Sequence, residues 1–450
     1  MSPPAGSAGG GLGGGLGGGA DRPAVHQFVP ALIPRDATGS HTLLLRQALR
    51  DAGWRSDIFA EATHDELLAE SIPLQYYPQY AAPGDVLVYQ MSTSSAVADF
   101  LLARPEPLVL DYHNITRPEL SEAWDPEPAR RSAEALAQLA ELAPRSVLGL
   151  ADSGFNELDL IAAGCPRTAV VPVLVDLDRL VAPADRRTAD RLAAAKAGGG
   201  ADWLFVGRVV PSKAAHDVVK ALWAYRRLYD PAARLHLVGS TPSNRYLASL
   251  RAFVADLGLR QAVRITGEVS DGALAAHFDA ADVYVSMSLH EGFGVPLLEA
   301  MRVGVPVVAR PAGAVADTVG DAGLVLHRSD PTTVAAAVHR VLTDRALRDR
   351  LVAAGRDRVA LHSLAAAGRR TVDAIASVVG APGKEGSTAG VPSAGIAGPH
   401  ASEEPAIKGW HGGAPGGPGS TAGVPSAGIA GPHASEEPGV GAPGGPGGTA

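Results

Sequence analysis

Two carboxylates, Glu291 and Glu299, bracket a short segment that contains Gly292, Gly294 and Pro296. A proline near the start of a helix sacrifices no hydrogen bond, and the free N–H groups and positive dipole of a helix start attract phosphate. The two glycines let the backbone approach such an anion closely, and the two carboxylates can accept hydrogen bonds from sugar hydroxyls. A pair of acids that only stabilises the helix dipole would not need the glycines. The segment therefore predicts a nucleotide-sugar site.

Two cations, Arg208 and Lys213, follow the apolar segment Trp203–Val206 and the turn residue Gly207. A guanidinium group offers a planar fork of donors to phosphate oxygens, and a lysine supplies a compact positive charge. Together they can neutralise a diphosphate and stabilise it as it departs. Taken alone, the two side chains are better explained as solvated surface cations.

The first half of the chain offers His113 and Gly39 as candidates. His113 follows the apolar segment Leu108–Tyr112, at the end of a predicted strand. A lone histidine is more often structural, and we assign His113 to chemistry because phosphate ligands are expected opposite it. Gly39 precedes Ser40, a suitable helix cap, so we expect the Gly39 backbone to contact a phosphate or a sugar. An ordinary capped loop is the alternative for that segment.

Asp176 and Asp178 form an Asp-x-Asp pair of the kind that can hold a divalent metal with nucleotide phosphates. They lie between the two halves of the predicted fold, and Arg208 with Lys213 can supply the charge that a metal would bring. We therefore expect neither a metal nor a cofactor, with a nucleoside-diphosphate sugar as co-substrate.

The elements that must position these residues alternate along the chain. Segments rich in Val, Leu and Ile alternate with helical stretches rich in Ala, Leu and Arg, as in a parallel sheet covered on both faces. Five or six strands are predicted in the first half and six in the second: Val25–Pro30, Ser56–Ala60, Val86–Gln90, Leu108–Tyr112, Val147–Leu150 and Ala169–Pro172, then Trp203–Val206, Arg234–Val238, Val263–Thr266, Val283–Ser286, Val305–Ala309 and Leu324–Leu326. Ligands of such sheets bind beyond the carboxyl ends of the strands, where the candidate residues lie.

Composition divides the chain into two α/β domains between two tails. Residues 1–24 are rich in Gly, and residues 379–450 are rich in Gly and Pro and contain a segment that is repeated verbatim. Such segments bury no apolar face, so we expect both tails to be disordered. Between them we expect one Rossmann-like domain over residues 25–176 and a second over residues 177–364, with a cleft between the two.

Charge and composition exclude several classes of protein. The formal net charge is −8, which argues against a nucleic-acid-binding protein. The single cysteine, Cys165, excludes an intrachain disulfide framework and suits a reducing cytosol. No segment has the apolar length of a membrane span or the layout of a signal peptide. We expect a cytoplasmic protein, and peripheral contact with the inner face of the membrane stays open.

Taken in order, these motifs resemble family 4 of the retaining glycosyltransferases, the glycosyl transferases group 1 with the GT-B fold, over about residues 25–378. Glu291 and Glu299 match the family's Glu-x7-Glu, and the segment Gly207–Lys213 matches its Gly-Arg-x4-Lys. The segment Ile265–Val269 is similar to the one that borders the nucleotide base in the family.

The resemblance implies transfer of a sugar from a nucleoside-diphosphate sugar, with retention at the anomeric carbon and without a required metal. It assigns the diphosphate to Arg208 and Lys213, the donor sugar to Glu291 and the ribose to Glu299. By the same resemblance, His113 contacts the donor sugar near the reacting carbon.

The resemblance also implies further features of the donor site and of the fold. A final helix over residues 365–378 is expected to return to the N-terminal domain. Ala214 stands where the family commonly has Gly, and Gln90 stands where many relatives have His on the acceptor side. The remaining positions assigned to donor binding are Gly39, Gly207, Gly267, Val269, Gly292, Phe293, Gly294 and Val295.

Two other functions fit the same residues: a nucleotide-sugar epimerase, and a nucleotide-sugar-binding subunit without catalysis. The acceptor is left open among glycans, lipid-linked compounds and small molecules, as in cell-wall or polysaccharide biosynthesis. No carboxylate of the N-terminal domain is obviously placed as a nucleophile. Front-face transfer is therefore favoured, in which the departing phosphate takes the proton of the acceptor hydroxyl while Arg208 and Lys213 stabilise the leaving group.

Overall fold

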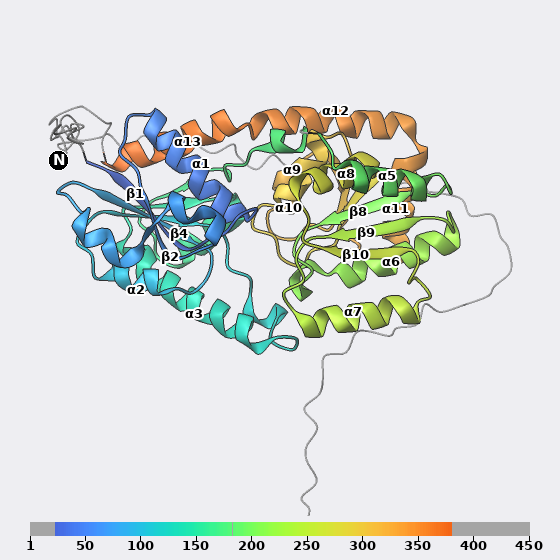
Figure 1. Cartoon of the computed structure of the whole chain (residues 1–450), viewed down its shortest axis with the longest axis horizontal. Helices are drawn as coiled ribbons and strands as arrows, with labels where there is room; N and C mark the ends of the chain where they lie inside the picture. The colour runs from blue at the N-terminus through green and yellow to red at the C-terminus, as the bar shows by residue number, and fades with distance from the viewer. Residues whose placement is uncertain (1–22, 182, 380–450) are drawn as a thin grey trace, which may run out of the picture.

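The computed structural model describes residues 23–181 and 183–379, which form two α/β units side by side (Figure 1). The predicted tails, residues 1–24 and 379–450, lie almost entirely outside the described residues. At their inner ends the prediction is wrong. Ala24 is fully buried and its N–H donates to Asp85 Oδ1 at 2.8 Å, and Val379 belongs to the last helix.

The first unit is built on a seven-stranded parallel sheet with the order β3-β2-β1-β4-β5-β6-β7. Its strands are β1 (Val25–Leu32), β2 (Ile58–Thr63), β3 (Ile72–Pro73), β4 (Val86–Met91), β5 (Leu108–Tyr112), β6 (Leu148–Ala151) and β7 (Thr168–Val170). The six strands predicted here are confirmed. The edge strand β3 was not predicted, because two residues are too short to show an apolar period.

The second unit is built on a six-stranded parallel sheet with the order β10-β9-β8-β11-β12-β13. This is the strand order of a Rossmann sheet. The first three strands are added toward one edge of the sheet, and the fourth to sixth are added toward the other edge. The strands are β8 (Asp202–Val206), β9 (Arg234–Val238), β10 (Val263–Gly267), β11 (Val283–Ser286), β12 (Val307–Ala309) and β13 (Gly323–Val325). All six had been predicted, with ends that differ by no more than two residues.

Helices alternate with the strands in both units (Figure 1). No helix among the described residues combines the length and apolarity that crossing a membrane requires. The α-helices are α1 (Ala37–Asp51), α2 (Ala96–Leu102), α3 (Pro126–Leu142), α4 (Gly154–Ala162), α5 (Arg186–Lys196), α6 (Ala215–Leu228), α7 (Asn244–Asp256), α8 (Asp271–Ala280), α9 (Val295–Arg302), α10 (Val315–Val319), α11 (Pro331–Thr343), α12 (Arg345–Leu361) and α13 (Leu364–Val379).

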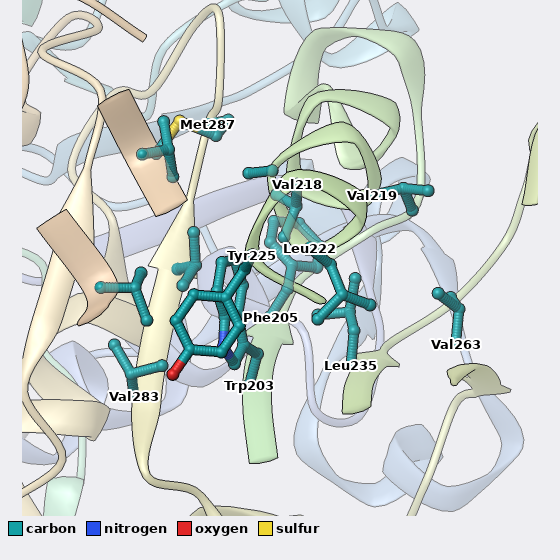
Figure 2. Close-up of a cluster of buried hydrophobic side chains, with 14 of the residues drawn as sticks. Trp203, Phe205, Val218, Val219, Leu222, Tyr225, Leu235, Val263, Val283 and Met287 are labelled. Carbon is teal, nitrogen blue, oxygen red and sulfur yellow. The ribbon is translucent and has the colours of Figure 1, made fainter. Parts of the chain in front are cut away.

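Strand β8 shows why these sheets are covered on both faces. Trp203 and Phe205 belong to one buried cluster and Leu204 to another, because successive side chains of a strand point to opposite faces. Figure 2 shows the first cluster, in which Trp203 and Phe205 lie against Leu222 and Tyr225 of α6. A strand that is buried on both faces is apolar along its whole length, which is the pattern that the sequence showed.

Two connections join the units. The first is the 3₁₀ helix Leu177–Val181, which follows β7, and the second is the pair α12 and α13, which run along one side of the molecule (Figure 1). Helix α13 packs on α1 of the first unit, where Ile375 shares a buried cluster with Leu45 and Leu49. The last helix therefore ties the end of the second unit back to the first.

Replacing Ile375 by Ala should destabilise the first unit, because this fully buried side chain fills the space between α13 and α1. Truncation of a buried isoleucine costs about 2–5 kcal/mol through lost burial and the cavity left behind. Urea unfolding of wild type and Ile375→Ala would measure the loss. The matched control is Asp373→Ala on the exposed face of α13, which should change the free energy of unfolding by less than about 0.5 kcal/mol. Equal effects of the two variants would show that α13 does not stabilise the first unit by docking.

Candidate active site

In the second sheet, the direction in which successive strands are added reverses between β8 and β11. These two strands are neighbours although they are far apart in sequence. Helices leave the two strands on opposite sides at such a point, so the chain opens a crevice there for a ligand. Gly207 and Arg208 follow β8, and the segment that contains Glu291 follows β11. The two motifs that the sequence singled out therefore lie beside each other at the topological switch point.

Lys213 and Glu291 are in direct contact at this point. The Lys213 Nζ donates to Glu291 Oε2 at 2.6 Å, and the two side chains are only 19% and 17% exposed. Lys213 ends the short 3₁₀ helix Pro211–Lys213, and Ala214 follows it with a φ of +46°. Glycine adopts this left-handed conformation most easily, which accounts for the glycine that the family prefers there. Arg208 is exposed at the end of β8.

Helix α9 begins where the Gly-Phe-Gly turn predicts. Gly294 is the N-cap residue with a φ of +91°, no side chain caps this helix start, and Pro296 is the second residue of the helix. Phe293, however, is only 6% exposed within an apolar cluster, against which Val295 also packs. The Phe293 carbonyl accepts a hydrogen bond from Thr318 Oγ1 at 2.6 Å. The Phe293 side chain therefore lies in the core, and the assignment of this residue to donor binding stays a prediction.

Glu299 lies one turn into α9 and is 2% exposed. Its Oε1 accepts a hydrogen bond from Arg179 Nη2, and Arg179 Nη1 also binds Asp271 Oδ1 at 2.5 Å. Burial raises the pKa of the Glu299 carboxyl, and the Arg179 charge opposes that rise. A ribose at Glu299 must therefore share this carboxylate with Arg179. The sequence did not single out Arg179, because nothing in the connecting segment marks it.

The ends of β9 and β10 are joined at Gly267. This residue has a φ of +74°, and its carbonyl accepts the N–H of Gly239 at 3.0 Å. Val269, two residues further, packs partly buried against the apolar cluster that contains Phe293. The segment predicted to border the nucleotide base thus lies at the same edge of the sheet as Gly207.

In the first unit, His113 follows β5 and is almost completely enclosed, with a side chain 5% exposed. Its Nε2 lies 2.6 Å from Gln90 Oε1, and its Nδ1 lies 3.1 Å from Asp152 Oδ2. Gln90 in turn donates to Gln27 Oε1 at 2.9 Å. Both ring nitrogens of His113 therefore have partners in the first unit, and a sugar hydroxyl could reach Nε2 only by displacing Gln90.

The His113 ring is positively charged at neutral pH. Burial alone would lower the pKa of His113, but the carboxylates of Asp152 and Asp111 outweigh it and raise that pKa to about 9. Asp111 is fully buried; desolvation would raise its pKa, yet His113 and His41 hold it below its usual value. An imidazolium donates from both nitrogens, which matches acceptors at Gln90 Oε1 and Asp152.

His41, Asp111 and His113 are the one group among the described residues whose ligand atoms, all within 4.8 Å of one another, could surround a metal ion. His41 Nδ1 accepts the N–H of Leu174 at 3.0 Å, so its proton lies on Nε2 and is donated to Asp111 Oδ2, also at 3.0 Å. A metal would have to replace that proton and the His113 proton. The three side chains already form a buried network of charges and hydrogen bonds.

The Asp-x-Asp pair between the units is engaged locally. Asp176 Oδ1 accepts the N–H of Asp178 at 2.9 Å, and the Asp178 carboxylate pairs with Arg302 of α9 at 2.7 Å. This arrangement anchors the connecting segment to the donor-side helix.

The predicted role of the Gly39 loop needs correction. Helix α1 begins at Ala37 with Asp36 as its cap, so Ser40 lies inside the helix and does not start it. The Gly39 N–H donates to Asp36 Oδ2 at 3.1 Å and is already used. A Cβ at position 39 would lie 2.6 Å from the carbonyl oxygen of Ile33. Glycine is therefore required there by the close packing of α1 on the end of β1.

The two units touch at the Glu291 segment. His290 Nε2 lies 2.5 Å from Asn114 Oδ1, and Ser153 Oγ donates to the carbonyl of Gly292 at 2.7 Å. A Cβ at position 292 would lie 2.5 Å from the Asn114 Cβ. The close approach that Gly292 permits is therefore to the first unit, whereas we had expected it to be to a phosphate.

Several residues of this junction had no predicted role. One of them, Asp111, lies near the carboxyl end of β5, and the others follow β5, β6 and β11. The rule that ligands bind beyond strand ends could therefore have pointed to them, but residue type alone did not. They are Asp111, Asn114, Asp152, Ser153 and His290. His41 of α1 and Arg179 gave no comparable signal, because each reaches its partner only through folding.

The pH dependence of stability should report the buried charge on His113. A folded pKa near 9, above the ordinary 6.5, contributes stability that is fully present below pH 6.5 and is lost as the pH rises through 9. The rise corresponds to roughly 3 kcal/mol. The difference in unfolding free energy between wild type and His113→Gln should be largest at pH 6 and shrink toward pH 9, as measured by urea unfolding. A difference that stays constant from pH 6 to pH 9 would contradict a charged His113.

Comparison with known sequences agrees with this geometry. Residues 187–358 match the family model described as glycosyl transferases group 1. The D-inositol 3-phosphate glycosyltransferase of Geodermatophilus obscurus is 36% identical over 292 residues, which are 62% of this chain and 62% of that protein. A GDP-mannose-dependent alpha-(1-6)-phosphatidylinositol monomannoside mannosyltransferase of Mycobacterium tuberculosis is 39% identical over 160 residues, 33% of this chain and 40% of that protein. The chain spans less than two thirds of the length of either relative.

Solved structures with the same fold bear out the two-unit architecture. The crystal structure of Anabaena HepE in complex with UDP and glucose has a TM-score of 0.64 at 19% identity and covers 79% of this chain and 100% of that one. Sucrose-phosphate synthase from Thermosynechococcus elongatus has a TM-score of 0.60 at 20% identity and covers 79% of this chain and 98% of that one. The chain therefore has the GT-B fold, and residues 187–358 match the glycosyl transferases group 1 model.

Proposed function

We propose that this protein transfers a sugar from a nucleoside-diphosphate sugar to an acceptor hydroxyl, with retention at the anomeric carbon. The observation that carries the proposal is the junction at Glu291. This carboxylate contacts Lys213 of the donor unit, and it directly follows His290, which binds Asn114 of the other unit. Because Asn114 directly follows His113, the junction brings the two predicted halves of the site together.

Charge supports a diphosphate donor. Lys213 keeps two further N–H groups beside the one that binds Glu291, and Arg208 is exposed at the neighbouring strand end. The start of α9 adds a helix dipole with no capping side chain. We propose that these three groups bind the diphosphate in place of a metal ion, while Glu291 binds the donor sugar and Glu299 the ribose.

His113 supplies positive charge on the acceptor side. Since its nitrogens are bound to Gln90 and Asp152, we propose that its charge acts on the donor sugar next to the reacting carbon. Gln90 thereby takes part indirectly, because its amide oxygen fixes the ring. This assignment modifies the expectation of a simple hydrogen bond from His113 to the sugar.

The chemistry fits front-face transfer within family 4. The bond between the anomeric carbon and the leaving phosphate oxygen breaks first, and the acceptor oxygen forms its bond to the same face of that carbon. The acceptor proton passes to the departing phosphate oxygen, so no protein base is consumed. Preorganised cations at Arg208 and Lys213 stabilise the charge that develops on the leaving diphosphate.

Names of relatives suggest acceptors to test. One relative is named for D-inositol 3-phosphate and another for a phosphatidylinositol monomannoside with GDP-mannose as donor. We propose a hydroxyl acceptor of the inositol class, soluble or lipid-linked, and a cytoplasmic enzyme that can meet a membrane surface. The protein can be incubated with UDP-, GDP- and ADP-sugars and with either D-inositol 3-phosphate or a phosphatidylinositol monomannoside as acceptor. NMR of the anomeric centre in the product then tests donor, acceptor and retention together.

The alternatives give different outcomes in the same experiment. Isomerised nucleotide sugar without an acceptor would indicate an epimerase. Tight donor binding with neither transfer nor hydrolysis would indicate a binding subunit. An inverted product would leave a glycosyltransferase but overturn front-face retention.

Removing either cation should slow transfer strongly. Arg208→Ala and Lys213→Ala are each expected to lower kcat by about 10²–10³-fold with donor at saturation, as for loss of one group that stabilises an oxyanion. The measurement is the initial rate of nucleoside-diphosphate release in the presence of acceptor. The matched control is Arg345→Ala, whose side chain is 93% exposed on α12 and which should keep wild-type turnover. Near-normal kcat in Arg208→Ala would remove this residue from the leaving-group site.

A further inference from the structure

We infer that Asn114 is a positioning residue: it fastens the segment that carries Glu291 to the first unit and so sets the geometry of the donor sugar site. The inference rests on the proposed transfer reaction and extends it to a residue that contacts neither diphosphate nor ribose in that proposal. Its structural part, the joining of the two units, can be measured independently of catalysis.

The backbone of Asn114 is unusual. Its φ is +69°, and Arg35 and Ala214 are the only other non-glycine residues in the described ranges with a positive φ. Asparagine tolerates this conformation better than most residues, because its short side chain can bond locally. Non-glycine residues held in such conformations concentrate at functional sites. Here the conformation directs the Asn114 side chain across the junction.

Both ends of the Asn114 amide are used. Its Oδ1 lies 2.5 Å from His290 Nε2 in the second unit, and its Nδ2 donates to Asn156 Oδ1 at 2.7 Å in the first. Asn156 is fully buried in α4 and cannot move freely. The amide therefore connects a rigid helix of one unit to the residue directly before Glu291.

The residue directly after Glu291 is held as well. Ser153 caps α4 and donates its hydroxyl proton to the carbonyl of Gly292 at 2.7 Å. From the second unit, Ala314 N–H donates to the carbonyl of Glu291 itself at 2.9 Å. The Glu291 backbone is thus anchored by its own unit, while both of its sequence neighbours are anchored by the other.

The protonation state of the His290 ring is consistent with a hydrogen on Nε2 that is donated to Asn114. The ring is 7% exposed and lies edge-on to Phe155, with ring centres 5.7 Å apart. Burial and then the charges of Lys213 and Arg117 lower the pKa of His290. The ring is therefore neutral at pH 7, and a neutral ring with hydrogen on Nε2 donates to the Asn114 oxygen. This bond does not carry a net charge that salt would screen.

The decisive variant is Asn114→Gly, because glycine keeps the positive φ and removes only the amide. We expect kcat for transfer to fall at least 10-fold, while the Kd of UDP, GDP or ADP, whichever the protein binds, changes less than twofold. Asn114→Asp should recover most of kcat. The new carboxylate can still accept from His290, and the buried Nδ2 of Asn156, which has no partner in the structure, can turn toward it. The matched control Asn244→Gly, exposed at the start of α7, should behave as wild type.

Small-angle scattering supplies the second measurement. Asn114→Gly should show a larger radius of gyration than wild type in the absence of ligand, because one bond between the units is lost. Unchanged kcat together with an unchanged radius would overturn the inference while leaving the proposed transferase intact. An equal loss of kcat and of nucleotide affinity would overturn it too, since that pattern indicates general damage. If wild type transfers no sugar, the proposed function fails, and the radius of gyration alone still decides whether Asn114 joins the units.

Discussion

The segment that carries Glu291 is held by contacts from both units. Lys213 fixes the Glu291 charge at 2.6 Å, and the backbone on either side is fastened across the junction by His290 and Gly292. These contacts exist only because parallel strands deliver their following residues to one edge of each sheet. The neighbouring strands β8 and β11 bring Lys213 to Glu291, and β5 and β6 bring the residues that hold the loop from outside.

In the first unit, charged side chains are also brought together near the ends of neighbouring strands, but there they are almost completely buried. Isolated buried ions are costly, so His113, Asp111 and Asp152 are stable there only as a mutually compensating set. His41 completes the set by donating to Asp111. A positive His113 is enclosed next to the junction, whereas Arg208 of the second unit is exposed. The enclosed His113 side chain is therefore fixed in place, whereas the exposed Arg208 side chain can change its conformation.

Much of this could be predicted from local patterns. Apolar segments gave twelve strands because a sheet buried on both faces leaves its mark on every residue of a strand. The turn at Gly294 and the helix start at Pro296 followed from backbone preferences of single residues. Local patterns failed where two features competed. Ser40 looked like a helix cap but Asp36 performs that role, and the side chain of Phe293, a residue assigned to donor binding, lies in an apolar cluster.

The sequence by itself determined the two parallel sheets and the helix start at Gly294, because each depends on the chemistry of a few adjacent residues. Tertiary structure alone decided the partners: Lys213 with Glu291, Arg179 with Glu299, and Asn114 with His290. These pairs are separated by 78, 120 and 176 residues. Which side chains meet over such distances depends on sheet order and on the docking of one unit against the other, and no local pattern encodes either.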